Sequence, residues 1–326
     1  MDDKSREPKD DTIEGFLEDA EVLQERFKGR RSVYVRAFLR DPATLLAAIT
    51  LILVVFAAVF GPALWPHDAY DQSLSNRLVP PGTDHSGDNG RYWLGTDGLG
   101  RDVVARLFLG ARVSLSVGIA GVVVSGLFGS ALGIVAGYFR GRTEDFLMRW
   151  TDLQMAFPTL ILALFLIFVI GPGFVTLVFV MAIVAWPLYA RVARSIAISI
   201  REEQYIEASH ALGSPAWRIL REHILPNARS PLLILSTLEF ARMILYEATL
   251  SFLGFGIQPP DTSWGLMISE GRQDIERAPW LIIVPGLCIL AAALSANLLA
   301  NWVQTITDPL RRAGWVRRGL KKGGAV

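Results

Sequence analysis

The sequence predicts an all-α, polytopic membrane protein with six transmembrane helices and both termini in the cytoplasm. Composition is the first reason, because 52% of the 326 residues are hydrophobic, only 19% are charged, and the mean hydropathy is +0.37. These values are too apolar for an ordinary soluble domain. Six separate stretches also approach the roughly 20 apolar residues that a helix needs to cross a bilayer. Third, Lys and Arg are distributed unevenly between the two ends of these stretches.

The six predicted spans follow one another along the chain. They run from Ala43 to Leu64, Val113 to Phe139, Thr151 to Ile170, Phe174 to Ala193, Pro231 to Leu253 and Leu281 to Val303. Gly171-Pro172-Gly173 is rich in helix breakers and predicts a tight turn between the third and fourth spans. The chain thereby divides into an N-terminal tail (1–42), the first span (43–64), an extracytoplasmic loop (65–112), a five-helix core (113–304) and a basic tail (305–326).

Basic residues predict the orientation of the spans. Twenty-one Lys and Arg residues lie near the span ends on one side, against seven on the other. Short translocated loops carry few such residues, so both termini and the loop from Arg194 to Arg229 are predicted to be cytoplasmic. No cleavable signal peptide is expected, because the first forty residues lack a short apolar region. Apolar residues in this tail recur at helical spacing and indicate either an amphipathic helix or a solvated tail; they are Ile13, Phe16, Leu17, Ala20, Leu23 and Phe27.

The second span carries a stripe of small residues. One such residue occurs at every fourth position, so their side chains share one helix face; they are Gly121, Ser125, Gly129, Gly133 and Gly137. Small side chains allow a second helix to approach closely, and this stripe therefore predicts tight helix packing within a bundle. Ahead of this span, Asp102 is predicted to cap a short amphipathic helix from Val103 to Leu109.

The fifth span is unusual because it contains three charged residues, Glu239, Arg242 and Glu247. A charge near the centre of a bilayer costs about 2.5–3.5 kcal/mol on insertion scales. At 100° per residue the three side chains fall within an arc of about 140°. This arrangement fits a translocation pathway, and it equally fits an internal ion pair with one further contact between helices.

Residues 201–226, between the fourth and fifth spans, are predicted to form two short helices joined by a turn. Gly213 is expected to adopt a positive φ after the first helix, Ser214 to cap the second, Pro215 to occupy its first position and Pro226 to close it. A hairpin tied to the membrane at both ends could not readily enter a major groove. A nucleic-acid partner is therefore not expected.

Within this hairpin, Glu207-Ala208-Ser209, then Gly213 and Leu225-Pro226, resemble the EAA motif of ABC importer permeases. Ser209 stands where the general motif has a second alanine. Further strings, at residues 93–102, 110–115, 156–158, 247–260 and 263–265, are similar to the C-type permease subunit of dipeptide, oligopeptide and nickel ABC importers. The resemblance covers roughly residues 35 to 310 and implies an ABC importer type I permease fold.

The resemblance also implies a heteromeric importer in a bacterial or archaeal cytoplasmic membrane. Its expected partners are a second (B-type) permease subunit, two cytoplasmic ATPase subunits, an extracytoplasmic solute-binding protein and the lipid bilayer. The chain contains no Gly-Lys dipeptide and hence no Walker A phosphate loop. No cofactor is expected on this chain, and ATP and Mg are expected on the partner subunits. The expected cargo is a di- or oligopeptide.

Three further groups of residues receive predicted roles. The residues expected to couple to the ATPases are Glu207, Ala208, Ser209, Ala211, Gly213, Leu225 and Pro226. The candidates for the pathway are Glu239, Arg242 and Glu247. The candidates for an outer gate or a contact with the binding protein are Asp97, Arg101, Asp102, Gln258 and Trp264.

Two other function classes compete with this interpretation. An ion-coupled secondary transporter could use Glu239, Arg242 and Glu247 as a relay, and the sequence alone leaves it open. A membrane enzyme is less compatible, because the metalloprotease and nucleophile-elbow motifs are both absent. The single cysteine, Cys288, and four scattered histidines predict neither a metal site nor redox chemistry.

Overall fold

The computed structural model describes residues 38–39, 41–84 and 91–307. By internal contacts the chain separates into a large unit, Leu46–Asn301, and a unit made of both chain ends. In the described part of the latter, the ring of Phe38 packs edge-on against Trp302, with centroids 5.0 Å apart. The amphipathic helix predicted in the N-terminal tail and most of the basic C-terminal tail lie outside the described residues.

Long α-helices occupy five of the six predicted spans. They are α3 (Pro42–Leu64), α4 (Val103–Phe139), α7 (Phe174–Arg201), α10 (Leu225–Phe252) and α12 (Trp280–Thr307). Four of them, α3, α4, α7 and α12, are long and apolar enough to cross a membrane. The helix α10 has the length, but it contains four charged residues, Arg229, Glu239, Arg242 and Glu247. The prediction of a polytopic membrane protein is confirmed at this level.

The third predicted span, Thr151 to Ile170, is not one continuous helix. It consists of α5 (Gly141–Met155) and α6 (Thr159–Ile170), which meet at 90°. The break lies at Ala156-Phe157-Pro158, where proline removes a backbone donor and disfavours the helical conformation of the residue before it. This bend, called the elbow below, corrects the prediction. The pair counts as a fifth span only if its two helices cross together.

The tight turn at Gly171-Pro172-Gly173 is confirmed. Gly171 has φ 100° and Gly173 has φ 148°, and α7 begins directly after them. The separate short helix predicted from Val103 to Leu109 is wrong, because it continues without interruption into the second span and gives α4 its 37 residues. Asp102 caps the start of this helix by accepting a hydrogen bond from the backbone N–H of Val104 at 2.8 Å.

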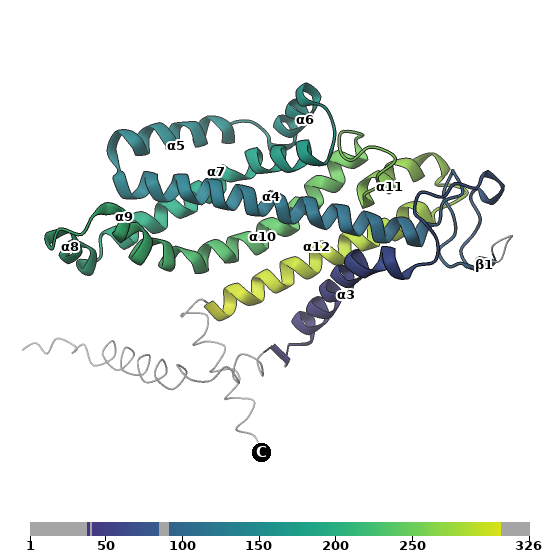
Figure 1. Cartoon of the computed structure of the whole chain (residues 1–326), viewed down its shortest axis with the longest axis horizontal. Helices are drawn as coiled ribbons and strands as arrows, with labels where there is room; N and C mark the ends of the chain where they lie inside the picture. The colour runs from purple at the N-terminus through teal and green to yellow at the C-terminus, as the bar shows by residue number, and fades with distance from the viewer. Residues whose placement is uncertain (1–37, 40, 85–90, 308–326) are drawn as a thin grey trace, which may run out of the picture. The chain divides into compact units, whose positions relative to one another are not determined.

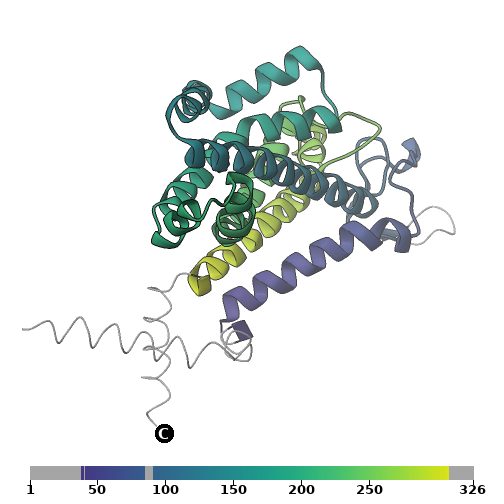
Figure 2. The ribbon, with the colours of Figure 1, turned by 60° about the vertical axis from the view of Figure 1, so that its left-hand side comes forward.

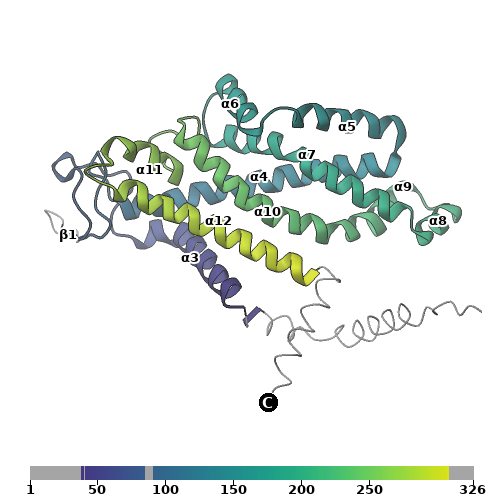
Figure 3. The ribbon, with the colours of Figure 1, turned by 180° about the vertical axis from the view of Figure 1, so that it is seen from behind.

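The large unit is organised around the pairing of α4 with α7. A Cβ atom on Gly129 or Gly133 would collide with the carbonyl oxygens of Trp186 and Ala190, respectively, and one on Gly137 would lie 2.6 Å from that of Arg194. The two backbones therefore touch along several turns. In all three views α5 and α12 lie on opposite sides of this pair (Figures 1, 2 and 3).

Shorter elements gather at the two ends of the bundle. At one end lie α8 (Gln204–Ala211), α9 (Ala216–Ile219) and the π-helical segment η2 (Leu220–Ile224). At the opposite end lie α11 (Trp264–Gly271) and the loop between α3 and α4 (Figures 1 and 3). This loop also contains an antiparallel ribbon of two two-residue strands, β1 (Thr83–Asp84) and β2 (Arg91–Tyr92), so the fold is not purely helical.

The glycine stripe gives a direct test of the α4–α7 contact. We expect Gly133→Ala to lower the midpoint of thermal unfolding in detergent, since overpacking a tight contact costs about 1–3 kcal/mol. Gly286→Ala in α12 is the matched control, because no atom lies within 4 Å of the added methyl group. A helical Gly→Ala change without a clash should leave the midpoint equal or higher. Equal midpoints for the two variants would contradict the close backbone approach.

Candidate functional site

The hairpin at residues 201–226 is fixed to the bundle by buried isoleucines. Ile206 of α8, Ile219 of α9 and Ile224 of η2 are fully buried, and they pack with Tyr138 at the end of α4 and Ala197 of α7. Each hairpin segment thus contributes an apolar anchor to the same cluster. Because α4 and α7 end here, a displacement of the hairpin reaches both helices directly.

The turn of the hairpin forms partly as predicted. Gly213 adopts φ 78°, and a Cβ atom added there would meet nothing within 4 Å, so its conformation and not its size requires glycine. The cap of α9 is Pro215, one position later than the predicted Ser214. The prediction that Pro226 closes the second helix is wrong. It lies in the first turn of α10, directly after the π-helical η2, and helical structure continues from α9 through η2 into α10.

Most residues of the EAA-like motif point away from the bundle. Exposed side chains include Glu207, Ala208, Ala211, Leu225 and Pro226, together with Gly213 itself. Ser209 is half-buried, and its hydroxyl donates to the Tyr205 carbonyl oxygen at 2.8 Å. Two large apolar side chains also stand free on this surface, since Leu212 is 87% exposed and Trp217 is 57% exposed. The hairpin therefore exposes small and apolar side chains on its outer surface, while its isoleucines pack against the bundle on the inner side.

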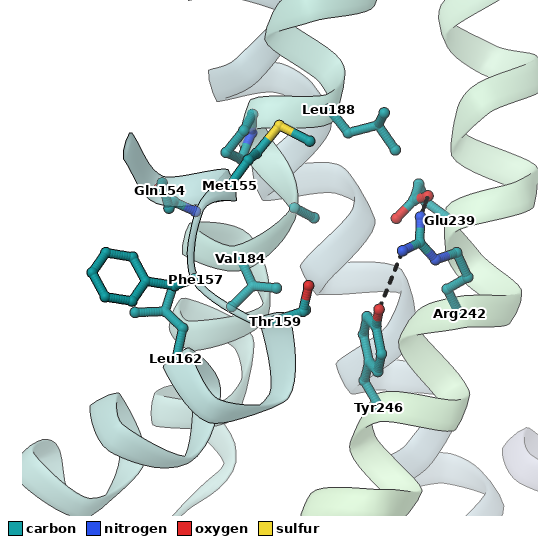
Figure 4. Close-up of a pocket in the computed structure, with 12 residues that line it drawn as sticks. Gln154, Met155, Phe157, Thr159, Leu162, Val184, Leu188, Glu239, Arg242 and Tyr246 are labelled. Carbon is teal, nitrogen blue, oxygen red and sulfur yellow. Dashed lines mark hydrogen bonds and ion pairs between the residues drawn. The ribbon is translucent and has the colours of Figure 1, made fainter. Parts of the chain in front are cut away.

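A second feature is a cavity of about 140 Å³ in the middle of the bundle. Its walls are the elbow on one side and α10 on the other, and α7 lies between them (Figure 4). The residues lining it are Gln154, Met155, Phe157, Thr159, Leu162, Val184, Ala185, Pro187, Leu188, Glu239, Arg242 and Tyr246. Gln154 holds the elbow against α7, because its amide oxygen accepts from the Trp186 indole N–H at 2.8 Å.

Glu239 and Arg242 form an ion pair at the α10 wall of this cavity. The Arg242 Nη1 lies 2.7 Å from Glu239 Oε1, and its Nη2 donates to the Tyr246 hydroxyl at 3.2 Å. The two partners differ in burial, since the Glu239 side chain is 5% exposed and that of Arg242 is 51% exposed. Figure 4 shows the guanidinium directed from α10 toward the elbow.

Glu247 does not join this pair, which fits the second of the two interpretations left open by the sequence, an internal ion pair with one further contact between helices. Its side chain is completely buried, and one carboxyl oxygen accepts from the Ser251 hydroxyl at 2.6 Å. The other oxygen has no hydrogen-bond partner among the described residues. The 140° arc is wider than one helix face, so its two edges point into different surroundings.

Two of the predicted outer-gate residues, Asp97 and Arg101, belong to a buried ion cluster at the α11 end of the bundle. Asp97 Oδ2 lies 2.6 Å from Arg101 Nε and 2.7 Å from Arg106 Nη1, and Glu270 of α11 accepts from both arginines at 3.1 and 2.6 Å. Arg106 also donates to the Thr262 hydroxyl at 2.9 Å. The cluster therefore fastens the loop between α3 and α4 to α4 itself and to α11.

Asp102 and Trp264 are buried beside this cluster. Asp102 accepts from the Trp65 indole at 2.9 Å and pairs with His67, while the Trp264 indole donates to the Leu107 carbonyl oxygen at 3.1 Å. Asp97, Arg101, Asp102 and Trp264 are each at most 6% exposed, so they offer little surface to a binding protein, and their role in an outer gate stays a prediction. Of the five candidates, only Gln258 is exposed on the chain as described.

Comparison with known proteins identifies the chain. The family model for the binding-protein-dependent transport system inner membrane component matches residues 129–313, and that for the N-terminal TM domain of oligopeptide transport permease C matches residues 32–81. The chain belongs to the binding-protein-dependent transport permeases. The hairpin and the cavity both lie within the first matched region.

Curated relatives of this permease cover most of its length. The di/tripeptide transport system permease protein DppC of Pseudomonas aeruginosa is 38% identical over 84% of this chain and 90% of that protein. The dipeptide transport system permease protein DppC of Alkalihalophilus pseudofirmus is 38% identical over 85% and 90%. The probable D,D-dipeptide transport system permease protein DdpC of Escherichia coli is 33% identical over 88% and 93%. The permease is thus a multi-pass membrane component of an ABC importer.

The ion cluster predicts how the stability of the permease depends on pH. Burial by itself raises the pKa of Asp97, but Arg106, Arg101 and two backbone N–H donors outweigh this effect and hold its pKa below the usual range. A carboxyl with a lowered folded-state pKa adds stability above its unfolded pKa of about 3.9. That contribution is lost as the pH falls through the lower, folded-state value.

We therefore expect Asp97→Asn to lower the thermal unfolding midpoint at pH 7, at a cost of about 3–5 kcal/mol for breaking a buried pair. The difference from the unsubstituted protein should narrow below about pH 4. Asp84→Asn is the control, because the Asp84 side chain is 92% exposed and lies 3.9 Å from Arg91. A penalty for Asp97→Asn that stays constant down to pH 2 would exclude this electrostatic origin.

Proposed function

We propose that this permease forms half of the translocation pathway of an ATP-driven importer of di- or oligopeptides. Its partners would be a B-type permease, two cytoplasmic ATPase subunits and an extracytoplasmic solute-binding protein. ATP and Mg would bind to the ATPases, and this chain would hold no cofactor of its own. The observation that carries the proposal is the exposed EAA-like hairpin seated on the ends of α4 and α7.

The hairpin is suited to receive motion from another protein. Its exposed small residues, Ala208 and Ala211, would let the hairpin fit closely into a groove on an ATPase subunit. Leu212 and Trp217 would pack their apolar side chains against the walls of that groove. The buried isoleucines below keep the hairpin rigid relative to the bundle. When ATP closes the ATPase dimer, its grooves would move, and the hairpin would carry this displacement into α7 and α10.

The cavity at Arg242 is the proposed pathway segment. A half-exposed guanidinium in lipid would cost about 2.5–3.5 kcal/mol on insertion scales. Facing water or a solute, as in a translocation pathway, Arg242 avoids this cost. An ion-coupled secondary transporter is less consistent with the molecule, because Glu247 lies apart from Glu239 and Arg242 and no continuous relay joins the three.

The peptide cargo rests on the relatives, whose names include dipeptide and di/tripeptide transport. We place the permease in a bacterial or archaeal cytoplasmic membrane with both termini inside. Six spans satisfy this orientation when α10 and the α5–α6 pair each cross once. The hairpin then lies in the cytoplasm and the ion cluster outside, at opposite ends of the bundle.

The turn of the hairpin provides a test of coupling. Gly213→Val should leave membrane insertion intact but uncouple ATP hydrolysis from uptake, because a β-branched residue does not tolerate φ 78°. Gly213→Asn is the matched control, since asparagine adopts this region readily. Peptide uptake and ATPase activity should be measured on the assembled importer in vesicles. Normal uptake per ATP in Gly213→Val would refute the coupling role.

Water access to the cavity tests the pathway. In a variant with Cys288 replaced by serine, Thr159→Cys should react with a membrane-impermeant thiol reagent during ATP turnover, because Thr159 lines the cavity. Ser114→Cys is the control, since that position on α4 is fully buried. An unreactive thiol at position 159 in an actively transporting complex would contradict a water-filled path.

A further inference from the structure

The cavity between the elbow and α10 has a chemical character that goes beyond a general path for solute. Two of its twelve lining residues are charged, and both belong to the Glu239–Arg242 pair. The pair is neutral overall, but its two charges are not equally accessible. Glu239 is nearly sealed, whereas half of the Arg242 side chain is exposed, so the cavity wall presents a cation.

Arg242 is held in one orientation and retains free donors. Glu239 accepts a hydrogen bond from Nη1, Tyr246 accepts one from Nη2, and the guanidinium carbon lies 5.8 Å from the centre of the Tyr246 ring. A guanidinium has five N–H donors in a planar fork. Two of them are engaged by described residues, which leaves three for a ligand.

From this geometry we infer that Arg242 binds the C-terminal carboxylate of a short peptide in transit, an inference that rests on the proposed function. A guanidinium fork matches a carboxylate with two parallel hydrogen bonds. Glu239 and Tyr246 act as positioning residues, because they fix the guanidinium and would not touch the peptide carboxylate. Across the cavity, Thr159 supplies a hydroxyl group for the peptide backbone.

Glu239 partly neutralises Arg242, and this weaker charge suits a transport site, from which the solute must be released. A lone buried guanidinium would hold a carboxylate tightly, and a pathway needs a contact that is favourable on entry and weak on exit. Glu239 lowers the attraction by competing for the same cation. The remaining face of Arg242 borders a mostly apolar groove between α10 and α12, lined by leucines such as Leu238 and Leu290, with Asn297 as its uncharged polar residue.

The test compares two peptides in the complete importer, reconstituted in vesicles with both permeases, the ATPases and the binding protein. The probes are radiolabelled dialanine and its C-terminal amide, presented at equal occupancy of the binding protein. In Arg242→Gln, the ratio of dialanine uptake to amide uptake should fall at least about tenfold relative to the unsubstituted complex. Because the same binding protein serves both complexes, its own preference cancels in this comparison.

Three variants separate a solute contact from a structural one. Arg242→Lys keeps the cation but loses the fork, so its uptake ratio should be intermediate. Arg142→Gln, at the exposed start of α5, should leave the ratio unchanged. Glu239→Gln removes the competing carboxylate, and dialanine should then dwell longer and be released more slowly. ATP hydrolysis stimulated by the loaded binding protein should persist in Arg242→Gln.

Two results would overturn the inference. One is an uptake ratio that stays within twofold of the original in Arg242→Gln. The other is failure of Arg242→Gln to co-purify with the second permease, which would assign Arg242 to a subunit interface. Absence of ATP-dependent dialanine uptake by the unsubstituted complex would instead contradict the proposed peptide importer itself.

Discussion

The backbone contact between α4 and α7 is the constraint on which the other features of this permease depend. Gly129, Gly133 and Gly137 of α4 lack the side chains that would separate the two helices, and the helices then pack at backbone distance. The hairpin anchors on the ends of this pair, and α7 also lies between the two walls of the cavity. A rigid α4–α7 unit therefore links the proposed coupling surface with the proposed solute site.

The charges of the molecule are divided between two kinds of environment. At the α11 end of the bundle, Asp97, Arg101, Arg106 and Glu270 neutralise one another in a cluster that holds the α3–α4 loop in place. In the middle of the bundle, the buried Glu239 pairs with one side of the Arg242 guanidinium, and the other side is exposed to the cavity. The first arrangement supports structure, whereas the second supports contact with a passing molecule.

Most of the long helices could be predicted because the length of an apolar stretch is a local property that can be read directly from the sequence. The break at Pro158 was missed, since the apolar run continues through it, although the charges of α5 at Glu144 and Asp152 were a usable signal. The burial of Asp97 and Asp102 could not be predicted from spacing. Arg106 and Glu270 meet across 164 positions, so only the tertiary structure reveals that the motif is an internal clamp.

Because helical structure is continuous from α9 through η2 into α10, a rotation of the hairpin is transmitted along the whole of α10. With a rise of about 1.5 Å per residue, Arg242 lies about 26 Å along the axis from Leu225. If the hairpin end acts as the fulcrum, a tilt of about 5° shifts the guanidinium sideways by about 2 Å. Such a step is comparable to the length of a hydrogen bond between heavy atoms. A modest rotation of the hairpin is therefore large enough to make or break a hydrogen bond to the Arg242 guanidinium.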